Sequence, residues 1–417
     1  MQVEKSFKFK LEPSDAQIKT LYQMAGCGRV VYNDSLTVML NILKKELSIT
    51  DRKELYKKLD NMPPKERIAL KKLLPNSASL NKQLTGWKKQ DNRVYLDEVF
   101  TDCLQQRQRD LCEAVNRWCA GRFGFPVFKQ RKLAHHSTMR FPAPKKQIKV
   151  KHKTIQFPRL LGDIKYRNSG DIQGEMRNAT VSLNAVGNWH VSFMCIIDIN
   201  LPEYVQGDQV GIDMGIAKNM TCSTDTVGDK GVFVGVNSFK RYQDKLANEQ
   251  RKLSRMVKGS ANWNKQRIKV AKLHKKITDT RRDYQHKATT EISNNHAMVV
   301  CEALKVKNMS KSAKGDQEQH GKNVAAKSGL NKRILDQGWH ELRRQLEYKM
   351  KWKGGIYAEV DPRNTSRECD CCGHTDKANR TTQADFECVH CGYVENADKN
   401  AARVILSRYI RNLEQTA

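Results

Sequence analysis

The amino-acid sequence predicts a multidomain α+β protein. A small β-barrel-like domain with a helical insertion is followed by an α/β domain into which a four-cysteine ribbon is inserted. Hydrophobic spacing in the N-terminal half changes from alternation to a helical period and then back to short alternating runs. In the C-terminal half, two apolar runs each carry one carboxylate, and two cysteine pairs precede an alanine-rich helix.

The composition is strongly basic. The 417 residues include 75 Lys and Arg against 45 Asp and Glu, a net charge of +30. Such a chain repels itself unless a polyanion neutralises it, so nucleic acid is the expected partner. A membrane-surface protein could share this balance, but no apolar run approaches the ~18 residues of a spanning helix, and the first residues lack a signal-peptide core. We therefore expect a cytoplasmic protein without a membrane partner.

A strand and then helices open the chain. Residues 3–11 alternate polar and apolar side chains, whereas residues 15–47 have apolar positions at helical spacing. The helical period continues to Gly121 and is clearest over residues 96–118. The opposite helix faces are basic. Their side chains could be solvated surface groups or could contact backbone phosphates of a nucleic acid, and the sequence does not favour either role. These side chains belong to Lys71, Lys72, Lys88, Lys89, Arg107 and Arg109.

Short strands return after Gly121. Polar turns between them indicate a barrel or sandwich, which the strand at residues 3–11 is expected to close around the helical insertion. Phe125 and Phe128 are interleaved with basic residues, as in nucleobase-stacking sites, but core packing is the favoured role. The strand-like runs are residues 148–150, 155–157, 179–183 and 189–197.

Three carboxylates are candidate catalytic residues. Asp213 lies between two glycines at the end of an apolar run, Glu302 near the end of another, and Asp398 at the start of the alanine-rich helix. Burying an unpaired carboxylate is costly, and glycines on either side are expected to let a substrate or metal approach the backbone. Singly, each has a structural alternative: a turn residue, a strand end or a helix N-terminal charge.

The order of strand, strand and helix is typical of an RNase H-like core, in which a sheet gathers three carboxylates at one edge. Mg²⁺ prefers such oxygen ligands, and two ions about 3.5–4 Å apart can activate water and stabilise the leaving 3′ oxygen. Without metal, clustered carboxylates raise at least one pKa. We therefore predict that Asp213, Glu302 and Asp398 are catalytic and bind two Mg²⁺ ions.

The two cysteine pairs predict a zinc ribbon. Cys369 and Cys372 are separated by fifteen residues from Cys388 and Cys391, the spacing of two knuckles that hold one structural Zn²⁺. A glycine directly follows each pair, as tight knuckles require.

Three further side chains in the ribbon could coordinate metal. Cys371 could replace Cys369 or Cys372 as a ligand in another register, and we retain Cys369 and Cys372 as the predicted ligands. His374 and His390 are expected to be solvated or to support the ligands, because the cysteines already complete a tetrahedral set. The remaining cysteines lie mostly in apolar runs and are predicted to be reduced core residues.

These motifs resemble the TnpB family, nucleases of bacterial insertion sequences and relatives of type V CRISPR effectors. The resemblance implies an RNA-guided DNA endonuclease of RuvC type that depends on Mg²⁺ and hydrolyses phosphodiester bonds. A guide RNA from the transposon end would pair with double-stranded target DNA, and the protein would read a short adjacent DNA motif. The matching segments span nearly the whole chain: residues 25–33, 124–129, 211–215, 282–287, 345–349, 365–369 and 396–398, with Glu302.

The resemblance also implies a domain order and a monomeric ribonucleoprotein associated with the prokaryotic nucleoid. The expected parts are a wedge β domain (1–12 and 123–205), a helical recognition domain (13–122), a RuvC-like nuclease domain (206–364 and 397–417) and the zinc ribbon (365–396). Within the nuclease domain we expect four further elements. These are long basic helices at the heteroduplex (239–292), a mobile gating loop (310–330), a helix (335–346) and a core strand (356–360).

Two other functions fit the same scaffold. A nuclease-dead, RNA-guided DNA-binding repressor would be expected to have lost one or more of the three carboxylates, and all are present. A transposase that catalyses strand transfer would use the same carboxylates, but the ribbon and the family motifs favour the nuclease.

Overall fold

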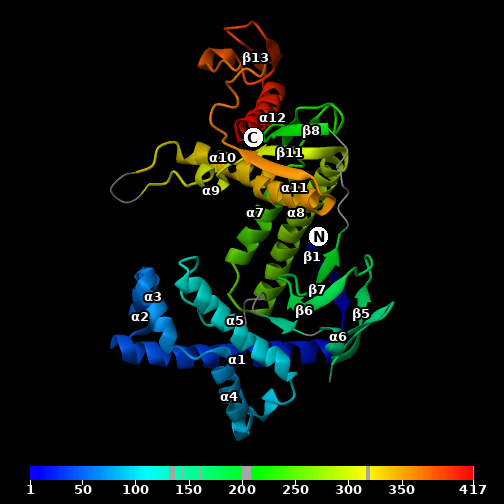
Figure 1. Ribbon diagram of the computed structural model, residues 1–417. Helices are drawn as coiled ribbons and strands as arrows, with labels where there is room; N and C mark the ends of the chain where they lie inside the picture. The colour runs from blue at the N-terminus through cyan, green and yellow to red at the C-terminus, as the bar shows by residue number, and fades with distance from the viewer. Residues whose placement is uncertain (131–136, 143, 159–160, 200–207, 316–319, 417) are drawn as a thin grey trace. The chain divides into compact units, whose positions relative to one another are not determined.

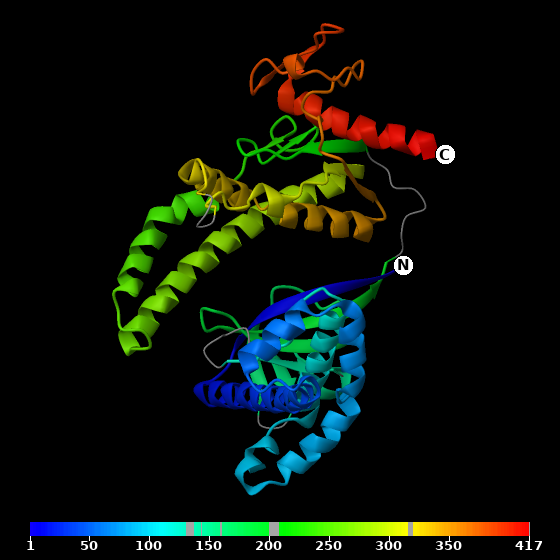
Figure 2. The same ribbon diagram turned by 90° about the vertical axis from the view of Figure 1, so that its left-hand side faces the viewer.

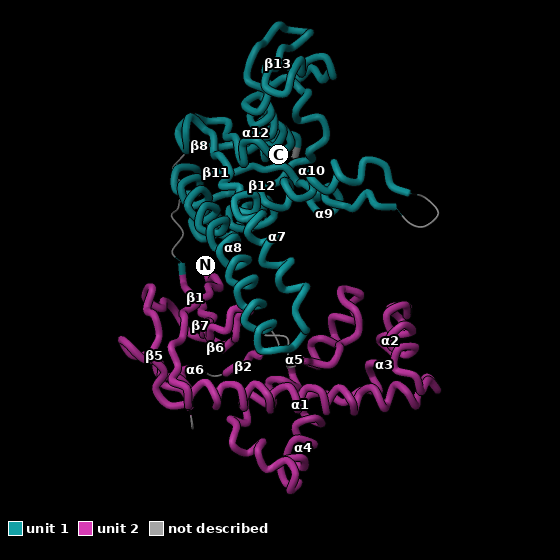
Figure 3. The backbone as a smooth tube through the Cα atoms, turned by 180° about the vertical axis from the view of Figure 1, so that it is seen from behind, with its two compact units in different colours: residues 1, 199–417 teal, residues 2–198 magenta. Residues whose placement is uncertain are grey.

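The structure is a computed structural model that describes residues 1–130, 137–142, 144–158, 161–199, 208–315 and 320–416 (Figure 1). The chain divides into two compact units, residues 2–198 and Met1 with residues 199–417 (Figure 3). The finer six-part domain order stays a prediction. Among the described residues, no helix has the length and apolar character needed to cross a membrane.

The unit of residues 2–198 combines an antiparallel sheet with helices that lie, in sequence, between its first and second strands. The helical part consists of α1 (Asp15–Leu47), α2 (Arg52–Asn61), α3 (Pro64–Leu73), α4 (Ser77–Lys88), η1 (Asp91–Leu96) and α5 (Thr101–Cys119). The sheet part consists of β1 (Gln2–Glu12), β2 (Thr138–Phe141), α6 (Pro144–Gln147), β3 (Lys149–Val150), β4 (Thr154–Phe157), β5 (Gly162–Arg167), β6 (Glu175–Leu183) and β7 (Trp189–Asp198).

The sheet is open and curled, with the strand order β2-β6-β7-β1-β5-β4-β3. Strand β1 is interior, because Phe9 pairs with Val191 of β7 and Leu11 with Tyr166 of β5. The curl brings the rings of Phe141 in β2 and Phe157 in β4 to a centroid distance of 5.7 Å. The expectation that the first strand closes a barrel is therefore wrong: β1 forms the middle of the sheet, whose outermost strands do not pair among the described residues.

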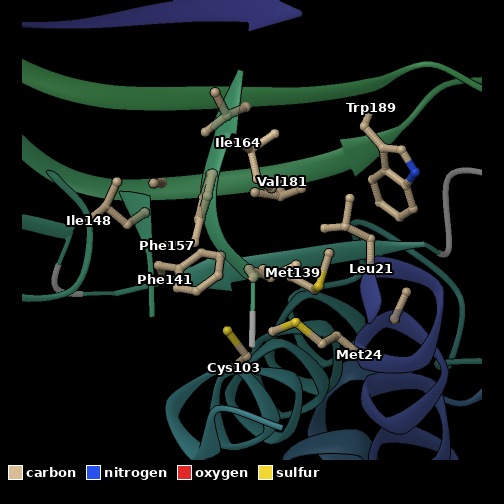
Figure 4. Packing of buried hydrophobic residues seen from close by; sticks show 14 of the residues in the cluster. Leu21, Met24, Cys103, Met139, Phe141, Ile148, Phe157, Ile164, Val181 and Trp189 are labelled. Carbon is tan, nitrogen blue, oxygen red and sulfur yellow. The ribbon is translucent and has the colours of Figure 1, made fainter. Parts of the chain in front are cut away.

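The N-terminal parts of helices α1 and α5 pack against this sheet, whereas their C-terminal parts pack with α2, α3 and α4. Leu21 and Met24 of α1 and Cys103 of α5 lie with Met139 and Trp189 in one hydrophobic core (Figure 4). Helix α1 begins after Ser14, whose side chain accepts the backbone N–H of Gln17 in a capping box. The predicted helix at residues 15–47 is confirmed.

Two expectations for the helical part are corrected. The 3₁₀ turn η1 and the start of α5 at Thr101 place Leu96 and Val99 outside α5, although both are buried. Arg107 is also buried and pairs with Asp110 at 3.3 Å, so it is neither a solvated residue nor available to a phosphate. Phe125, by contrast, is 4% exposed, as core packing predicts.

The unit of residues 199–417 is built on a five-stranded sheet of order β10-β9-β8-β11-β12, in which β8, β11 and β12 are parallel. The strands are β8 (Asp208–Asp213), β9 (Met220–Cys222), β10 (Val232–Phe233), β11 (His296–Glu302) and β12 (Ile356–Val360). The helices are α7 (Ser238–Ser254), α8 (Ala261–Asn295), α9 (Val306–Met309), α10 (Val324–Gln337), α11 (Trp339–Lys353) and α12 (Ala397–Thr416). The ribbon adds η4 (Lys377–Asn379), β13 (Asp385–Glu387) and β14 (Val394–Asn396).

Both faces of this sheet are covered. Along β11, Met298 and Val300 pack with Ile405 of α12, whereas Val299 and Cys301 pack with α8, α10 and α11 on the other face (Figure 2). Burial on both faces explains why β11 is a continuous apolar run rather than an alternating one.

Helices α7 and α8 form the long basic helices expected from the sequence and pack together through Leu246, Val270 and Ile277. The expected loop at residues 310–330 is partly wrong, because α10 begins at Val324; residues 316–319 of that loop lie outside the described residues. The expected single helix at residues 335–346 is two helices that meet at Gly338, where φ is +69°.

Candidate functional site

Strands β8 and β11 place two of the predicted carboxylates side by side. In their parallel register, Ile212 lies opposite Cys301, and the next residues, Asp213 and Glu302, are the last of their strands. Because parallel strands end at the same edge of a sheet, the two carboxylates lie at one level.

Helix α12 supplies the third carboxylate. A Cβ on Gly211 would lie 2.0 Å from the carbonyl oxygen of Ala402, so only glycine permits this approach of α12 to β8. Asp398 lies one helical turn before Ala402, and its charge acts on Asp213. The expected role of the first glycine is therefore wrong: Gly211 makes room for a helix, not for a substrate or metal.

Burial disfavours the charged forms of the two carboxylates at the strand ends. Burial, followed by the charges of Glu302 and Asp398, raises the pKa of Asp213 to about 7. Burial also raises the pKa of Glu302, which is only 6% exposed. Such groups resist simultaneous ionisation unless a cation neutralises them.

Two basic side chains reach Asp398. The Nζ of Lys218, in the loop after β8, lies 3.3 Å from Oδ2, and a guanidinium nitrogen of Arg380, in the ribbon, lies 3.7 Å from Oδ1. Sequence reasoning missed both residues, because nothing local distinguishes them among 75 Lys and Arg.

Glu302 is held from two sides. Thr365 donates its hydroxyl to Oε1 of Glu302 at 2.5 Å, and both residues are buried. Arg343 donates to the backbone oxygen of Glu302 at 3.2 Å. Thr365 belongs to a family motif in the sequence, but its contact with Glu302 was not predicted.

The four predicted cysteines gather in one cluster. Their sulfur atoms all lie within 4.8 Å of one another, with 3.7 Å between Cys369 and Cys391 and 3.6 Å between Cys372 and Cys388. A tetrahedron of sulfurs ~2.3 Å from a central zinc ion has edges of about 3.8 Å. The cluster can therefore hold a metal ion of zinc size.

The knuckles have the predicted geometry. Gly373 and Gly392 adopt φ values of +74° and +72°, and their N–H groups donate to the carbonyls of Cys369 and Cys388. Cys371 is exposed and lies outside the cluster. His374 and His390 stack on each other with ring centroids 5.3 Å apart and are also outside it.

Helix α12 anchors the ribbon. Glu368 accepts hydrogen bonds from Arg408 at 2.7 and 2.5 Å and pairs with Arg411. The buried Asn400 donates to the carbonyl of Glu368 at 2.8 Å and accepts the N–H of Asp370 at 3.1 Å. One helix thus carries Asp398 and fixes the ribbon that carries Arg380.

The sequence is 40% identical over 402 residues to InsQ of Escherichia coli (strain K12), a match that covers 96% of this chain and 91% of InsQ. The chain belongs to the TnpB family. A relative from Streptomyces pristinaespiralis is 32% identical over 413 residues, covering 97% of this chain and 89% of the relative. Both relatives carry the provisional name of an RNA-guided DNA endonuclease.

Three family models match parts of this TnpB protein. The insertion-sequence OrfB model, described as "Probable transposase", matches residues 193–313, and a Cas12f1-like TNB domain matches residues 339–405. A helix-turn-helix model matches residues 1–46, where the structure instead has β1 followed by the single helix α1.

A solved Cas12f1–sgRNA–target DNA complex is 16% identical with a TM-score of 0.34, covering 98% of this chain and 100% of that one. At that score the similarity does not establish a shared fold.

Proposed function

We propose that this TnpB-family protein is an RNA-guided endonuclease that hydrolyses phosphodiester bonds of double-stranded DNA at Asp213, Glu302 and Asp398. The observation that carries the proposal is the gathering of these carboxylates at one sheet edge, in a chain 40% identical to a relative of that name. A five-stranded sheet in which only β9 runs opposite to the other strands, with the last carboxylate on a covering helix, supports an RNase H-like core of RuvC type.

The donor set fits Mg²⁺, because all three side chains offer the hard oxygen ligands that this ion prefers. Asp213, Glu302 and Asp398 would hold two ions, which when bound supply an activated water and stabilisation of the leaving 3′ oxygen. Thr365 orients Glu302 in this scheme, and Lys218 and Arg380 balance charge on Asp398.

The proposed partners are a guide RNA from the transposon end and target DNA with a short adjacent motif, bound by a monomer. The net charge of +30 and the exposed basic residues of α7 and α8 support nucleic-acid binding through backbone phosphates, with base pairing supplying the sequence specificity.

To test this function, the protein is co-expressed with the DNA that flanks its gene, and the bound RNA is sequenced. The purified particle is then given matching DNA and Mg²⁺. Asp213→Ala should abolish guide-dependent cleavage, whereas Glu66→Ala, at an exposed acid on α3 outside the segments that match the family, should retain it. RNA-guided binding without cleavage would instead indicate a repressor.

Strand transfer is the second candidate, because the OrfB model carries the description of a transposase. The same reaction distinguishes the two, since joined DNA products would support a transposase and simple breaks the endonuclease. Absence of any bound RNA would also favour the transposase.

We also propose that the ribbon holds one structural Zn²⁺. Cys391→Ser should lose zinc, measured as metal content per chain, whereas Cys371→Ser should keep it because Cys371 lies outside the cluster. Equal zinc contents in the two variants would contradict the proposed ligand set.

A further inference from the structure

A buried amide pair lies behind the loop that follows Asp213. Asn219 and Gln337 are 1% and 4% exposed, and Nδ2 of Asn219 donates to Oε1 of Gln337 at 2.6 Å. The Nε2 of Gln337 donates in turn to the carbonyl oxygen of Ile216 at 3.3 Å. Gln337, the last residue of α10, thus binds the loop at two points, one on each side of Lys218.

Neighbouring residues pack closely around Gln337. A Cβ on Gly235 would lie 2.7 Å from Oε1 of Gln337. At Gly338 the chain turns with φ +69°, and the Nε2 of Gln285 donates to its carbonyl oxygen at 3.1 Å. The position of Gln337 is therefore set by packing on both sides.

The neighbouring residue Asp336 anchors the end of α10. Its carboxylate, which is buried, accepts the backbone N–H of Phe239 at 2.9 Å and the hydroxyl of Ser238 at 3.0 Å, at the start of α7. The end of α10 is thereby fixed to the start of α7 while Gln337 holds the loop.

The loop also turns tightly just before the first held point. A Cβ on Gly215 would lie 2.7 Å from the carbonyl oxygen of Lys218, so the turn closes on itself. The side chain of Lys218 then reaches Asp398, with Nζ 3.3 Å from Oδ2. The amide pair therefore restrains the backbone that presents this ammonium group to the carboxylates.

We propose that Gln337 is a positioning residue that holds Lys218 against Asp398, and that Lys218 thereby lowers the affinity of the carboxylate site for divalent cations. This inference rests on the proposed function, because it takes the three carboxylates to be metal ligands. An ammonium group on Asp398 repels an incoming cation and occupies a carboxylate oxygen, so metal must compete with it.

The test measures binding of Mn²⁺, a spectroscopic probe for the site, to the full-length protein by electron paramagnetic resonance. The variants are Lys218→Met, Gln337→Met and the double variant. The matched control is Gln345→Met, which removes a buried glutamine of α11 that bonds Glu341 and Thr289 and does not touch the loop. Thermal unfolding of each variant reports the purely structural cost.

Lys218→Met should tighten Mn²⁺ binding by about tenfold, the order expected for removing one charge at this distance. Gln337→Met should tighten it less, and the double variant should match Lys218→Met, because both changes act through one contact. Gln345→Met should lower stability without changing Mn²⁺ affinity.

Weaker Mn²⁺ binding by Gln337→Met, or additive effects in the double variant, would overturn the inference. The inference would also be overturned if Gln337→Met left the Mn²⁺ affinity unchanged and lowered stability as Gln345→Met does. Gln337 would then have only a structural role. Failure of the proposed function gives a different result, since the wild-type protein would then bind Mn²⁺ no better than Asp213→Asn does.

Discussion

Asp213 and Glu302 place ionisable side chains at the ends of strands whose apolar residues belong to hydrophobic cores. Their raised pKa values show that the fold alone does not favour the charged forms. Ionising these buried, neighbouring carboxylates costs free energy, and a bound cation lowers that cost. The same property makes the metal-free protein sensitive to pH.

Asp213→Asn should stabilise the protein in Mg²⁺-free buffer above neutral pH. The folded-state pKa of about 7 exceeds the ordinary Asp value of 3.8, so the folded protein binds the extra proton and loses stability as pH rises between these values. Asn removes that loss, and we expect a Tm higher by about 4–8 °C at pH 8. Calorimetry at pH 5 and 8 tests this, and an equal Tm difference at both pH values would contradict it.

Thr365→Val should impair the site through Glu302. Valine keeps the shape of threonine but removes the donor to a buried carboxylate, which costs about 1–3 kcal/mol of unfolding free energy. We expect the Mg²⁺ concentration needed for half-maximal cleavage to rise by about tenfold or more, the usual effect of removing a residue that orients a metal ligand. Denaturant unfolding and Mg²⁺ titration measure the two effects. Thr365→Ser is the control, and the prediction fails if Ser and Val behave alike.

At the scale of elements, α12 decides the geometry of the site. It packs across β8 at Gly211, presents Asp398 in its first turn, and binds the ribbon through Asn400 and Arg408. The carboxylate cluster and the ribbon therefore depend on the position of one helix.

Gly211→Ala should displace that helix. The new methyl group would meet backbone atoms of α12, including the N of Leu406 at 2.9 Å, and backbone cannot rotate aside as a flexible side chain can. We expect a loss of about 2–3 kcal/mol or more in unfolding free energy, together with loss of cleavage. Denaturant unfolding measures the first quantity.

Gly329→Ala is the matched control, because it lies inside α10 with nothing within 4 Å of the added Cβ. It should stabilise the protein by roughly 0.5–1 kcal/mol, the ordinary gain of Ala over Gly in a helix. Equal effects at the two glycines would show that helix packing at Gly211 is not the cause.

At the scale of the whole molecule, the excess of 30 positive charges dominates the expected association with nucleic acid. Binding that neutralises phosphates releases counterions, so affinity for RNA should fall steeply with salt. If roughly ten phosphates are contacted, we expect a loss of about 10³-fold or more between 50 and 200 mM salt. Filter binding with the RNA that copurifies measures the slope, and a salt-independent affinity would contradict phosphate contacts.

The sequence by itself determined the features that depend on short stretches of chain. The spacing of Cys369, Cys372, Cys388 and Cys391 specified the cluster, because a knuckle is a local turn whose geometry a few residues dictate. Helical periodicity likewise located α1, and a continuous apolar run located β11. The strand β12 was expected from the family resemblance.

The tertiary structure alone decided which distant residues meet. Lys218 and Arg380 reach Asp398, Thr365 reaches Glu302, and Gly211 admits α12, yet no local pattern marks any of these contacts. The central place of β1 and the break at Gly338 were missed for the same reason. Hydrophobic periodicity records whether a face is buried, whereas the identity of the partner depends on how separate elements pack.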